Sequence, residues 1–139
     1  MYLLDTNVVS ELRKGRRAER DVRRWAEAQS LSSLYLSTMS ILELEVGILL
    51  IARRDPHQAG ILRTWMDKHV LPTFRGRILP IDTAVAQRCA ALHVPNPRSD
   101  RDALIAATAL VHGLTVVTRD TKDFETMIGD LINPWALKY

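Results

Sequence analysis

The stretch Met1–Leu12, MYLLDTNVVSEL, joins a short apolar run to Asp5 and then to residues typical of the start of a helix. The same order, a short β-rich run followed by a longer helical pattern, recurs at Leu34–Ser37 (LYLS), Arg77–Ile81 (RILPI) and Leu114–Thr118 (LTVVT). Strands that alternate with helices need right-handed crossovers, which cover both faces of a parallel sheet with helices. We therefore predict an α/β fold, a three-layer α/β/α sandwich with a central, mainly parallel sheet.

Helical patterns fill the segments between these runs. The first helix follows Asp5 and ends at about Leu12, and the helix after LYLS is expected to begin at Ser40. Further helices are expected near Glu19–Ala28, His57–Val70, Thr83–His93 and Asp100–His112. The chain has 139 residues, of which 47% are hydrophobic. This is the size of one compact domain with a proper core, so we expect a single domain over residues 1–139.

Basic residues outnumber acidic ones slightly, with 19 Lys and Arg against 16 Asp and Glu and a net charge of +3. They cluster in Arg13–Arg24, RKGRRAERDVRR, where arginine predominates. Arginine suits phosphate because its planar fork donates two hydrogen bonds at once, so this stretch could attract a polyanion. A solvated helix face, with Glu19 and Asp21 among the arginines, explains the stretch equally well.

The single cysteine, Cys89, excludes a disulfide framework and a zinc cluster within one chain. Its spacing from Val85 and Leu92 is helical and indicates a buried, inert thiol. The apolar run Val46–Ala52 has only seven residues, too few to span a bilayer. The N-terminus begins directly with a strand rather than a signal peptide. We therefore expect a cytoplasmic protein without a membrane segment.

Four acidic residues are expected where a parallel sheet gathers the ends of its strands. Asp5 ends the first apolar run, and Asp120 follows LTVVT with one residue between them. Glu43 lies six residues after LYLS, in the first turn of its expected helix, and Asp102 starts the helix that leads into LTVVT. The carboxyl ends of parallel strands meet at one edge of the sheet, where ligands bind. All four carboxylates should therefore meet at that edge.

Helix capping is a structural alternative for each of these acids. The patterns allow a cap at Asp5 or Thr6, a cap at Asp120 or Thr121, and capping boxes at Ser40–Glu43 and Ser99–Asp102. Four acids from four separate segments, however, indicate a shared site more strongly than four unrelated caps.

Such a site needs a cation or bound protons. Two carboxylates roughly 6 Å apart repel by about 2 to 3 kcal/mol at an effective dielectric constant near 20. Because all the expected ligands are oxygen atoms, magnesium or manganese is favoured over zinc. None of the four histidines is expected at this edge: His57, His69, His93 and His112. A magnesium site beneath an arginine-rich surface suits phosphodiester hydrolysis by an activated water.

Six motifs, taken in order, carry a resemblance to a known family. They are LLDTNVVSEL at the start, LSTMSILELEVG around Glu43, GRILPID in the middle, DALIAATAL from Asp102, VVTRDTKDF at Asp120 and NPW at Asn133–Trp135. The chain resembles the PIN-domain ribonucleases over nearly its whole length. Within that family it is most similar to the VapC toxins of prokaryotic toxin–antitoxin pairs, especially the FitB-like branch.

The resemblance implies that Asp5, Glu43, Asp102 and Asp120 form the acidic quartet that holds Mg²⁺ or Mn²⁺ and performs catalysis. It also selects Asp102 over Asp100 because Asp102 directly precedes the IAATA helix. The fourth position stays open, because Asp123 lies one helical turn from Asp120 and family members differ in this segment. Thr6, Asn7 and Thr118 are candidates either for orienting the acids or for local turn and cap hydrogen bonds.

The family cleaves RNA, commonly leaving a 5′-phosphate and a 3′-hydroxyl, and the resemblance implies a VapB-type antitoxin that packs between the first helices and blocks the acidic pocket. It also implies a homodimer within a larger toxin–antitoxin complex. The helix from Ser40 to Arg54 is apolar around most of its circumference, so it should be buried on more than one side, inside the domain or against another chain. Gly47 within it suggests close approach by a neighbouring element.

Two other classes of function compete with a ribonuclease. One is a non-catalytic RNA-binding or partner-binding module that keeps the fold without the chemistry. The other is a phosphotransfer or phosphatase domain with Asp5 as its nucleophile, which would require a D-x-D pair, whereas position 7 is Asn. No Ser–His–Asp pairing or phosphate-binding glycine loop is evident.

Overall fold

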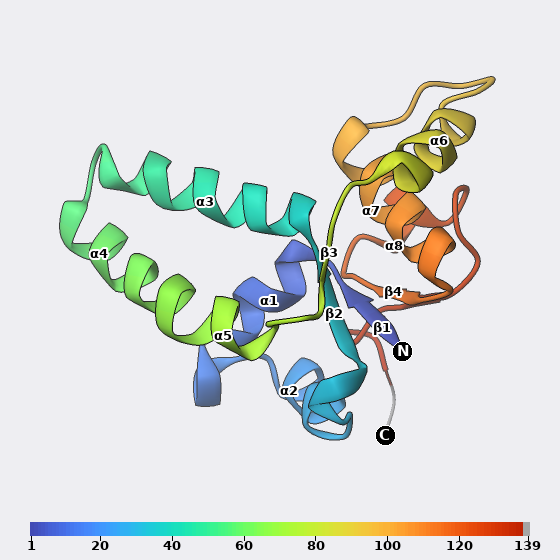
Figure 1. Ribbon diagram of the computed structural model, residues 1–139. Coiled ribbons are helices and arrows are strands. Elements are labelled where there is room, and N and C mark those ends of the chain that lie inside the picture. Colours follow the sequence, from blue (N-terminus) through green and yellow to red (C-terminus); the bar gives the residue numbers. More distant parts are fainter. Residues whose placement is uncertain (138–139) are drawn as a thin grey trace.

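The computed structural model describes residues 1–137, which surround a sheet of five short strands (Figure 1). The strands are β1 (Tyr2–Leu4), β2 (Leu34–Ser37), β3 (Ile78–Leu79), β4 (Thr115–Val117) and β5 (Leu131–Ile132). Their order across the sheet is β3-β2-β1-β4-β5, and every neighbouring pair is parallel. The predicted parallel sheet is therefore confirmed. The sequence prediction missed β5 because a strand of two residues has no readable alternation of apolar and polar positions.

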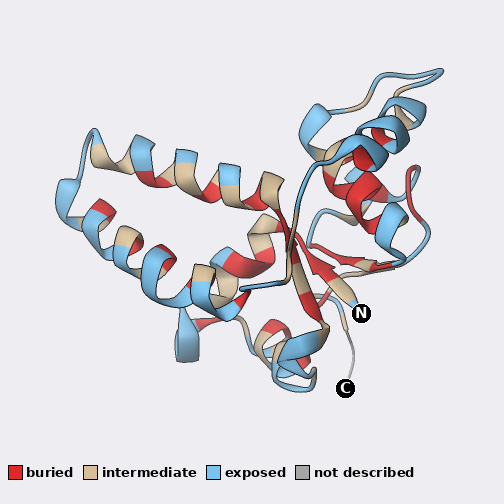
Figure 2. Cartoon of the chain, viewed as in Figure 1, coloured by how far each residue is buried: buried red, intermediate tan, exposed pale blue. Residues whose placement is uncertain are grey.

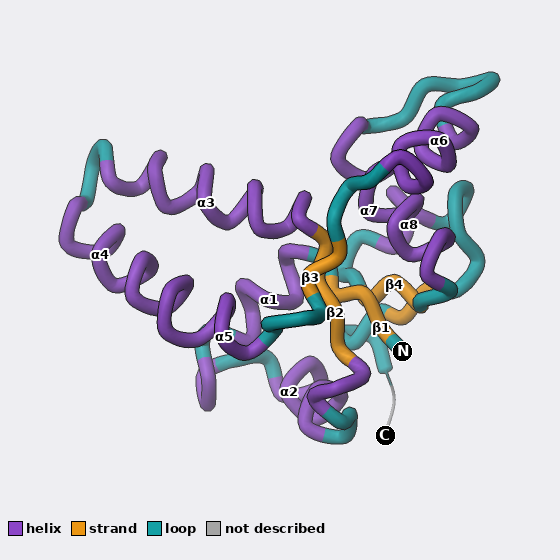
Figure 3. Tube along the Cα trace, viewed as in Figure 1, coloured by secondary structure: helices purple, strands orange, loops and turns teal. Residues whose placement is uncertain are grey.

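Helices lie on both faces of this sheet, as the three-layer prediction requires (Figures 1 and 3). On one face lie α1 (Thr6–Leu12), α2 (Arg20–Glu27), α3 (Thr38–Ala52), α4 (Pro56–Trp65) and α5 (Leu71–Thr73), with a π-helical turn at Met66–Val70 between the last two. On the other face lie α6 (Thr83–Leu92), α7 (Asp100–His112) and α8 (Thr121–Phe124). Short 3-10 turns occur at Gly15–Arg17 and Leu31–Ser33.

Most residues of β1 and β4 are buried, as the red colour of β1 shows in Figure 2, and their side chains belong to two core clusters, one on each face of the sheet. Successive residues of a strand point to opposite faces, so Leu3 packs with Phe124 below α7 and Leu4 packs with Met66 below α1 and α4. Each of these side chains is at most 1% exposed. Burial of one such side chain stabilises the fold by roughly 1.5 to 3 kcal/mol. The core therefore fixes β1, and Asp5 at its end, from both sides.

The start of α3 differs from the prediction. Ser37 caps the helix, because its hydroxyl accepts a hydrogen bond from the Met39 amide at 3.0 Å, and the helix begins at Thr38. The predicted capping box at Ser40–Glu43 is therefore wrong. Ser40 is fully buried inside the helix, and Glu43 lies in its second turn rather than its first. The expected helix His57–Val70 is instead α4, begun by an Asp55 cap, followed by the π-helical turn.

Helices α3 and α4 form a long antiparallel hairpin that projects away from the sheet (Figure 1). Arg63 of α4 fastens the hairpin, because its guanidinium donates to both carboxylate oxygens of Glu45 on α3. The opposite face of α3 is not covered within residues 1–137. Its aliphatic side chains are 45% to 66% exposed at four positions: Leu42, Val46, Leu49 and Leu50.

The exposed face shows that α3 is not buried on more than one side within residues 1–137. Burial against another chain is the alternative that remains. A Cβ atom added at Gly47 would meet no heavy atom within 4 Å, so no element of the described chain makes the predicted close approach there.

Cys89 is buried as predicted, and burial raises the pKa of its thiol. No helix in residues 1–137 combines the length and apolarity needed to cross a membrane.

Candidate active site

Asp5 stands at the carboxyl end of β1, where the strand turns into α1. Its backbone amide donates to the Val117 carbonyl at 2.9 Å, which keeps the residue in register with β4. One carboxylate oxygen accepts from the Thr6 amide at 2.8 Å, and the other accepts from the Thr118 hydroxyl at 2.7 Å. Asp5 is only 8% exposed. The sequence allowed either Asp5 or Thr6 as the cap of α1, and the structure shows that it is Asp5. Asp5 is at the same time a buried carboxylate.

Asn7 and Thr118 connect this carboxylate to Asp120. The Asn7 side-chain amide donates to Asp120 Oδ2 at 3.2 Å, and the Asp120 backbone amide donates to Thr118 Oγ1 at 3.0 Å. Thr118 is fully buried at the end of β4. Although Asp120 stands at the cap position of α8, its side chain makes no capping hydrogen bond. Its contacts orient it toward Asp5 rather than toward its own helix.

Thr6 and Arg101 hold Glu43 from two sides. Thr6 Oγ1 lies 3.1 Å from Glu43 Oε1 and 3.0 Å from Ser40 Oγ, and its single proton can serve one of these oxygens at a time. Arg101 Nη1 donates to Glu43 Oε2 at 2.7 Å, although the two residues are far apart in sequence. Arg101 is thus the cation that directly contacts an acid of the predicted quartet.

Asp102 enters the site from the first turn of α7. The Ser99 hydroxyl caps this helix by accepting from the Asp102 amide at a long 3.4 Å, so the capping prediction for Ser99 is confirmed. The Asp102 carboxylate itself is not the cap. Burial raises the pKa of this carboxylate most, followed by the charge of Asp123 on α8, with smaller effects from Asp5 and Asp120.

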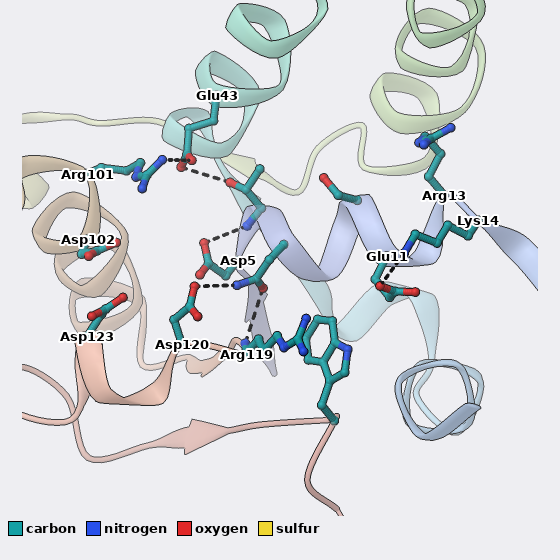
Figure 4. Close-up of a pocket in the computed structure, with 14 residues that line it drawn as sticks. Asp5, Glu11, Arg13, Lys14, Glu43, Arg101, Asp102, Arg119, Asp120 and Asp123 are labelled. Atoms are coloured by element: carbon teal, nitrogen blue, oxygen red, sulfur yellow. Dashed lines mark hydrogen bonds and ion pairs between the residues drawn. The ribbon is translucent and has the colours of Figure 1, made fainter. Parts of the chain in front are cut away.

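These side chains line one cavity of about 510 Å³ (Figure 4). Six acids line it: Asp5, Glu11, Glu43, Asp102, Asp120 and Asp123. Basic side chains also reach it: Arg13, Lys14, Arg101 and Arg119. Figure 4 shows most of the acids gathered between α7, α8 and the start of α1, with Arg13 and Lys14 at the far end of α1. The cavity therefore has an acidic end and a mainly basic end, where Glu11 is paired with Lys14.

Burial and mutual repulsion make the charged form of these acids unfavourable. Burial raises the pKa of Asp5, while the hydrogen bonds from Thr118 and Thr6 act in the opposite direction. Burial also raises the pKa of Glu43, and the Arg101 charge opposes this. For Asp102, burial and then the charge of Asp123 raise the pKa. A cation bound among these carboxylates would relieve the repulsion.

The donor set fits a hard divalent cation, because the acidic end offers only oxygen ligands and none of the four histidines lines the cavity. Within residues 1–137, however, no three acidic, histidine or cysteine side chains are already arranged around one point where a metal ion could sit. Here Glu43 faces Arg101, Asp5 faces Thr118, and Asp120 faces Asn7. Ligation of one ion requires some of these side chains to rotate.

All four predicted site residues therefore reach the same cavity from four different segments. Asp123, the alternative for the fourth position, lines it as well, so the structure brings both candidates to the site. Thr6, Asn7 and Thr118 each hydrogen-bond an acid of the site, which favours the orienting role over a purely local one. Sequence reasoning missed Arg101 and Arg119, although each directly precedes a predicted acid in the chain.

Comparisons with known proteins agree on one family. A family model described as the PIN domain matches residues 2–127. The chain is 41% identical to the plasmid stability protein StbB of Pseudomonas syringae pv. tomato, over 97% of this chain and 99% of that protein. It is 40% identical to the VapC ribonuclease Y4jK of Sinorhizobium fredii, over 97% and 98% of the two chains. Identity to the toxin FitB of Neisseria gonorrhoeae is 37%, over 97% and 99%.

Solved structures give the same result. The crystal structure of FitAcB from Neisseria gonorrhoeae superimposes with a TM-score of 0.89 and 36% identity, over 99% of this chain and all of that one. A toxin–antitoxin complex from Klebsiella pneumoniae matches with a TM-score of 0.72 and 30% identity, over 99% and 100% of the two chains. Both matches extend over the sheet and the helices on its two faces.

Proposed function

The chain belongs to the PIN-domain family, and we propose that it is a Mg²⁺- or Mn²⁺-dependent endoribonuclease that acts in the cytoplasm as the toxin of a VapBC-type toxin–antitoxin pair. Residues 1–139 would form one PIN domain. The observation that carries the proposal is the meeting of Asp5, Glu43, Asp102 and Asp120 in one cavity that also holds basic side chains. The VapC ribonuclease and FitB toxin among the relatives support the same assignment.

The side chains of the cavity would divide the work of phosphodiester hydrolysis. Asp5 and Asp102, with Glu43 and Asp120, would hold the divalent cation, with Asp123 as the alternative fourth acid. When bound, such a cation supplies a Lewis acid that lowers the pKa of water and offsets charge on the leaving oxygen. Thr6, Thr118 and Asn7 keep the carboxylates oriented through their hydrogen bonds. Arg101 is positioned beside Glu43 to offset the negative charge that a substrate phosphate adds.

An apolar groove beside the cavity supports an antitoxin as partner. The groove has a volume of about 370 Å³ and lies between α1, α2 and α4, with Val9, Leu12, Trp65 and Phe74 among its lining side chains. Arg13 lines both the groove and the acidic cavity. An apolar segment of an antitoxin seated here would lie next to the RNA site and could obstruct it. The related Klebsiella structure is itself a toxin–antitoxin complex.

The exposed aliphatic face of α3 supports a homodimer. A contact between two copies of one chain brings identical surfaces together, so an uncharged face avoids like-charge repulsion on a protein with net positive charge. The face formed by Leu42, Val46, Leu49 and Leu50 has this character. Such dimers would assemble with the antitoxin into a larger complex.

The central test is cleavage of RNA by the purified protein with Mn²⁺ and by an Asp5→Asn variant. Asn keeps the size of the side chain but removes the charge, so cleavage and growth inhibition should be lost while the circular dichroism spectrum is retained. Asp130→Asn is the matched control, because Asp130 is exposed and lies outside the cavity. Mapping of new 5′ ends in cellular RNA after induction would identify the substrate. Full activity of Asp5→Asn would refute the assignment.

The non-catalytic binding module is the remaining alternative. Titration of the protein with Mn²⁺ in a calorimeter separates the two, because saturable binding that depends on Asp5 is expected only for the enzyme. The phosphotransfer alternative has little support, since Asn7 serves as a hydrogen-bond donor to Asp120 and cannot be the second acid of a D-x-D pair.

A further inference from the structure

Arg119 and Trp135 form a stacked pair in the wall of the acidic cavity. The guanidinium carbon of Arg119 lies 5.4 Å from the centroid of the Trp135 ring, within the range of a cation–π interaction. Both side chains line the cavity, and Figure 4 shows Arg119 next to Asp120. Neither Arg119 nor Trp135 belongs to the acidic quartet.

Hydrogen bonds of Asn133 and Asn7 fix the backbone on both sides of the pair. The Asn133 side chain accepts from the Trp135 amide at 3.0 Å and donates to the Arg119 carbonyl at 3.5 Å. The Arg119 amide in turn faces Asn7 Oδ1 at 3.5 Å. The motif NPW at the end of the chain thus gains a structural role, because it attaches Trp135 to the segment that carries Thr118 and Asp120. These bonds fix the backbone of Arg119, and the Trp135 ring supports its guanidinium.

The charge of Arg119 is available to a ligand. Its side chain is exposed, and among residues 1–137 no carboxylate lies within ion-pair distance of it. Lys14, across the basic end of the cavity, is by contrast paired with Glu11 at 3.0 Å. A guanidinium with a free planar fork, fixed over an aromatic ring, is suited to bind a phosphate through two hydrogen bonds.

The position of Arg119 relative to the acids defines which phosphate it would bind. Figure 4 shows Arg119 between Asp120 and Glu11, and its charge lowers the pKa of Glu11, so it lies at the border between the acidic and mainly basic ends. The cavity continues from there along α1 toward Arg13, roughly 12 Å from Asp5 at a helical rise of about 1.5 Å per residue. A single-stranded polynucleotide carries a phosphate at every nucleotide and can follow such a groove.

From this geometry we infer that Arg119, held in place by Trp135, binds the phosphate of the nucleotide next to the scissile phosphate in single-stranded RNA. This inference rests on the proposed ribonuclease function and adds a substrate-binding subsite to it. Trp135 is a positioning residue, since it acts through the guanidinium that it supports.

Steady-state cleavage of a single-stranded oligoribonucleotide tests the subsite. Arg119→Ala should raise KM about tenfold with little change in kcat, because the lost phosphate contact is remote from the reacting bond. Arg54→Ala is the matched control, since Arg54 is an exposed arginine at the far tip of the α3–α4 hairpin (Figure 1). Trp135→Ala should raise KM by a smaller factor, and Trp135→Phe should recover most of that loss because it restores an aromatic ring.

The salt dependence of binding provides a second measurement that needs no turnover. In the Asp5→Asn background, the slope of log Kd for the oligoribonucleotide against log salt concentration should decrease by about 0.7 when Arg119 becomes Ala, as expected for one phosphate contact on a single strand. Arg119→Lys should keep the slope and lose part of the affinity. If Arg119→Ala lowers thermal stability, Arg119→Lys and Trp135→Phe still test the inference.

The outcomes separate this inference from the proposed function. If the parent protein cleaves RNA and Arg119→Ala has the KM and salt slope of Arg54→Ala, the subsite is refuted and the ribonuclease assignment stands. A loss of kcat with unchanged KM would also refute it, because Arg119 would then act on the reacting phosphate. If no RNA is cleaved but the salt slope depends on Arg119, the ribonuclease assignment fails and the phosphate-binding site is supported.

Discussion

Asp102→Asn should stabilise the metal-free protein and yet abolish its activity. Within residues 1–137 the Asp102 carboxylate makes no hydrogen bond. Burial raises its pKa most, the charges of Asp123, Asp5 and Asp120 raise it further, and the charge of Arg101 lowers it. Two charges roughly 6 Å apart interact by about 0.7 kcal/mol in water and about 3 kcal/mol at an effective dielectric constant of 20. Since the site is open to solvent, removal of this charge should raise the free energy of unfolding by about 1 kcal/mol.

The sign of this effect depends on pH. A carboxyl group whose pKa is raised by folding binds a proton more readily in the folded than in the unfolded protein, so its charge destabilises the fold at neutral pH. The benefit of Asn should therefore be full near pH 7, fall as the pH drops through the raised pKa of Asp102 in the folded protein, and be absent below about 4, where Asp102 is protonated in both states. A gain of about 1 kcal/mol corresponds to a rise in Tm of roughly 3 °C for a chain of this size.

Thermal unfolding followed by circular dichroism, in EDTA and in MnCl₂, is the assay. In EDTA the Asp102→Asn variant should unfold above the parent protein. Saturating Mn²⁺ should reverse the order, because a ligand at one hundred times its Kd adds about 2.7 kcal/mol to the protein that binds it. Asp67→Asn is a control of opposite sign, since Asp67 pairs with Arg63 at 2.7 Å. A Tm in EDTA below that of the parent would refute the claim that Asp102 is crowded by like charges.

Three further changes test other parts of the structure. Thr118→Val removes the hydroxyl that donates to Asp5 and should lower activity roughly 10- to 100-fold, measured as RNA cleavage, with unchanged secondary structure; full activity would contradict an orienting role. Ser37→Ala removes the cap of α3 and should cost about 1 kcal/mol in urea unfolding, whereas an equal stability would place the cap elsewhere. Leu49→Lys should convert a dimer to a monomer in light scattering with little change in Tm, because Leu49 is 66% exposed; an unaffected dimer would exclude the α3 face.

The site was predictable from the sequence to the extent that topology alone determines it. Parallel strands bring their carboxyl ends to one edge, so the positions of Asp5 and Asp120 after apolar runs were enough to place both acids there. Glu43 was assigned to the correct cavity although its helix begins two residues earlier than expected. Both Ser37 and Ser40 match a cap, and the local pattern cannot distinguish them. In the structure Ser37 is the cap, and Ser40 instead contacts Thr6, which is distant in sequence.

Contacts that depend on side-chain conformation could not be predicted from the sequence. The ion pair of Arg101 with Glu43 joins two helices from different parts of the chain, and no local pattern encodes it. The sequence left open whether α3 is covered within the chain or against another chain, because hydropathy shows that a helix is apolar but not which of its sides is covered. The pairing of Arg119 with Trp135 depends in the same way on β5, whose two residues carry no signal of their own.

Asp5 illustrates why a capping residue and a metal ligand need not be alternatives. Its two oxygens accept one hydrogen bond each, from the Thr6 amide and from the Thr118 hydroxyl, so each keeps lone pairs for a further partner. A cap alone would be served as well by Asn or Ser, without the cost of a buried charge. Because Asp5 is 8% exposed and burial raises its pKa, capping does not account for a carboxylate at this position. The cation proposed for the acidic end of the cavity would account for it, and Asp5→Asn separates the two roles, since Asn can keep the cap while it loses the charge.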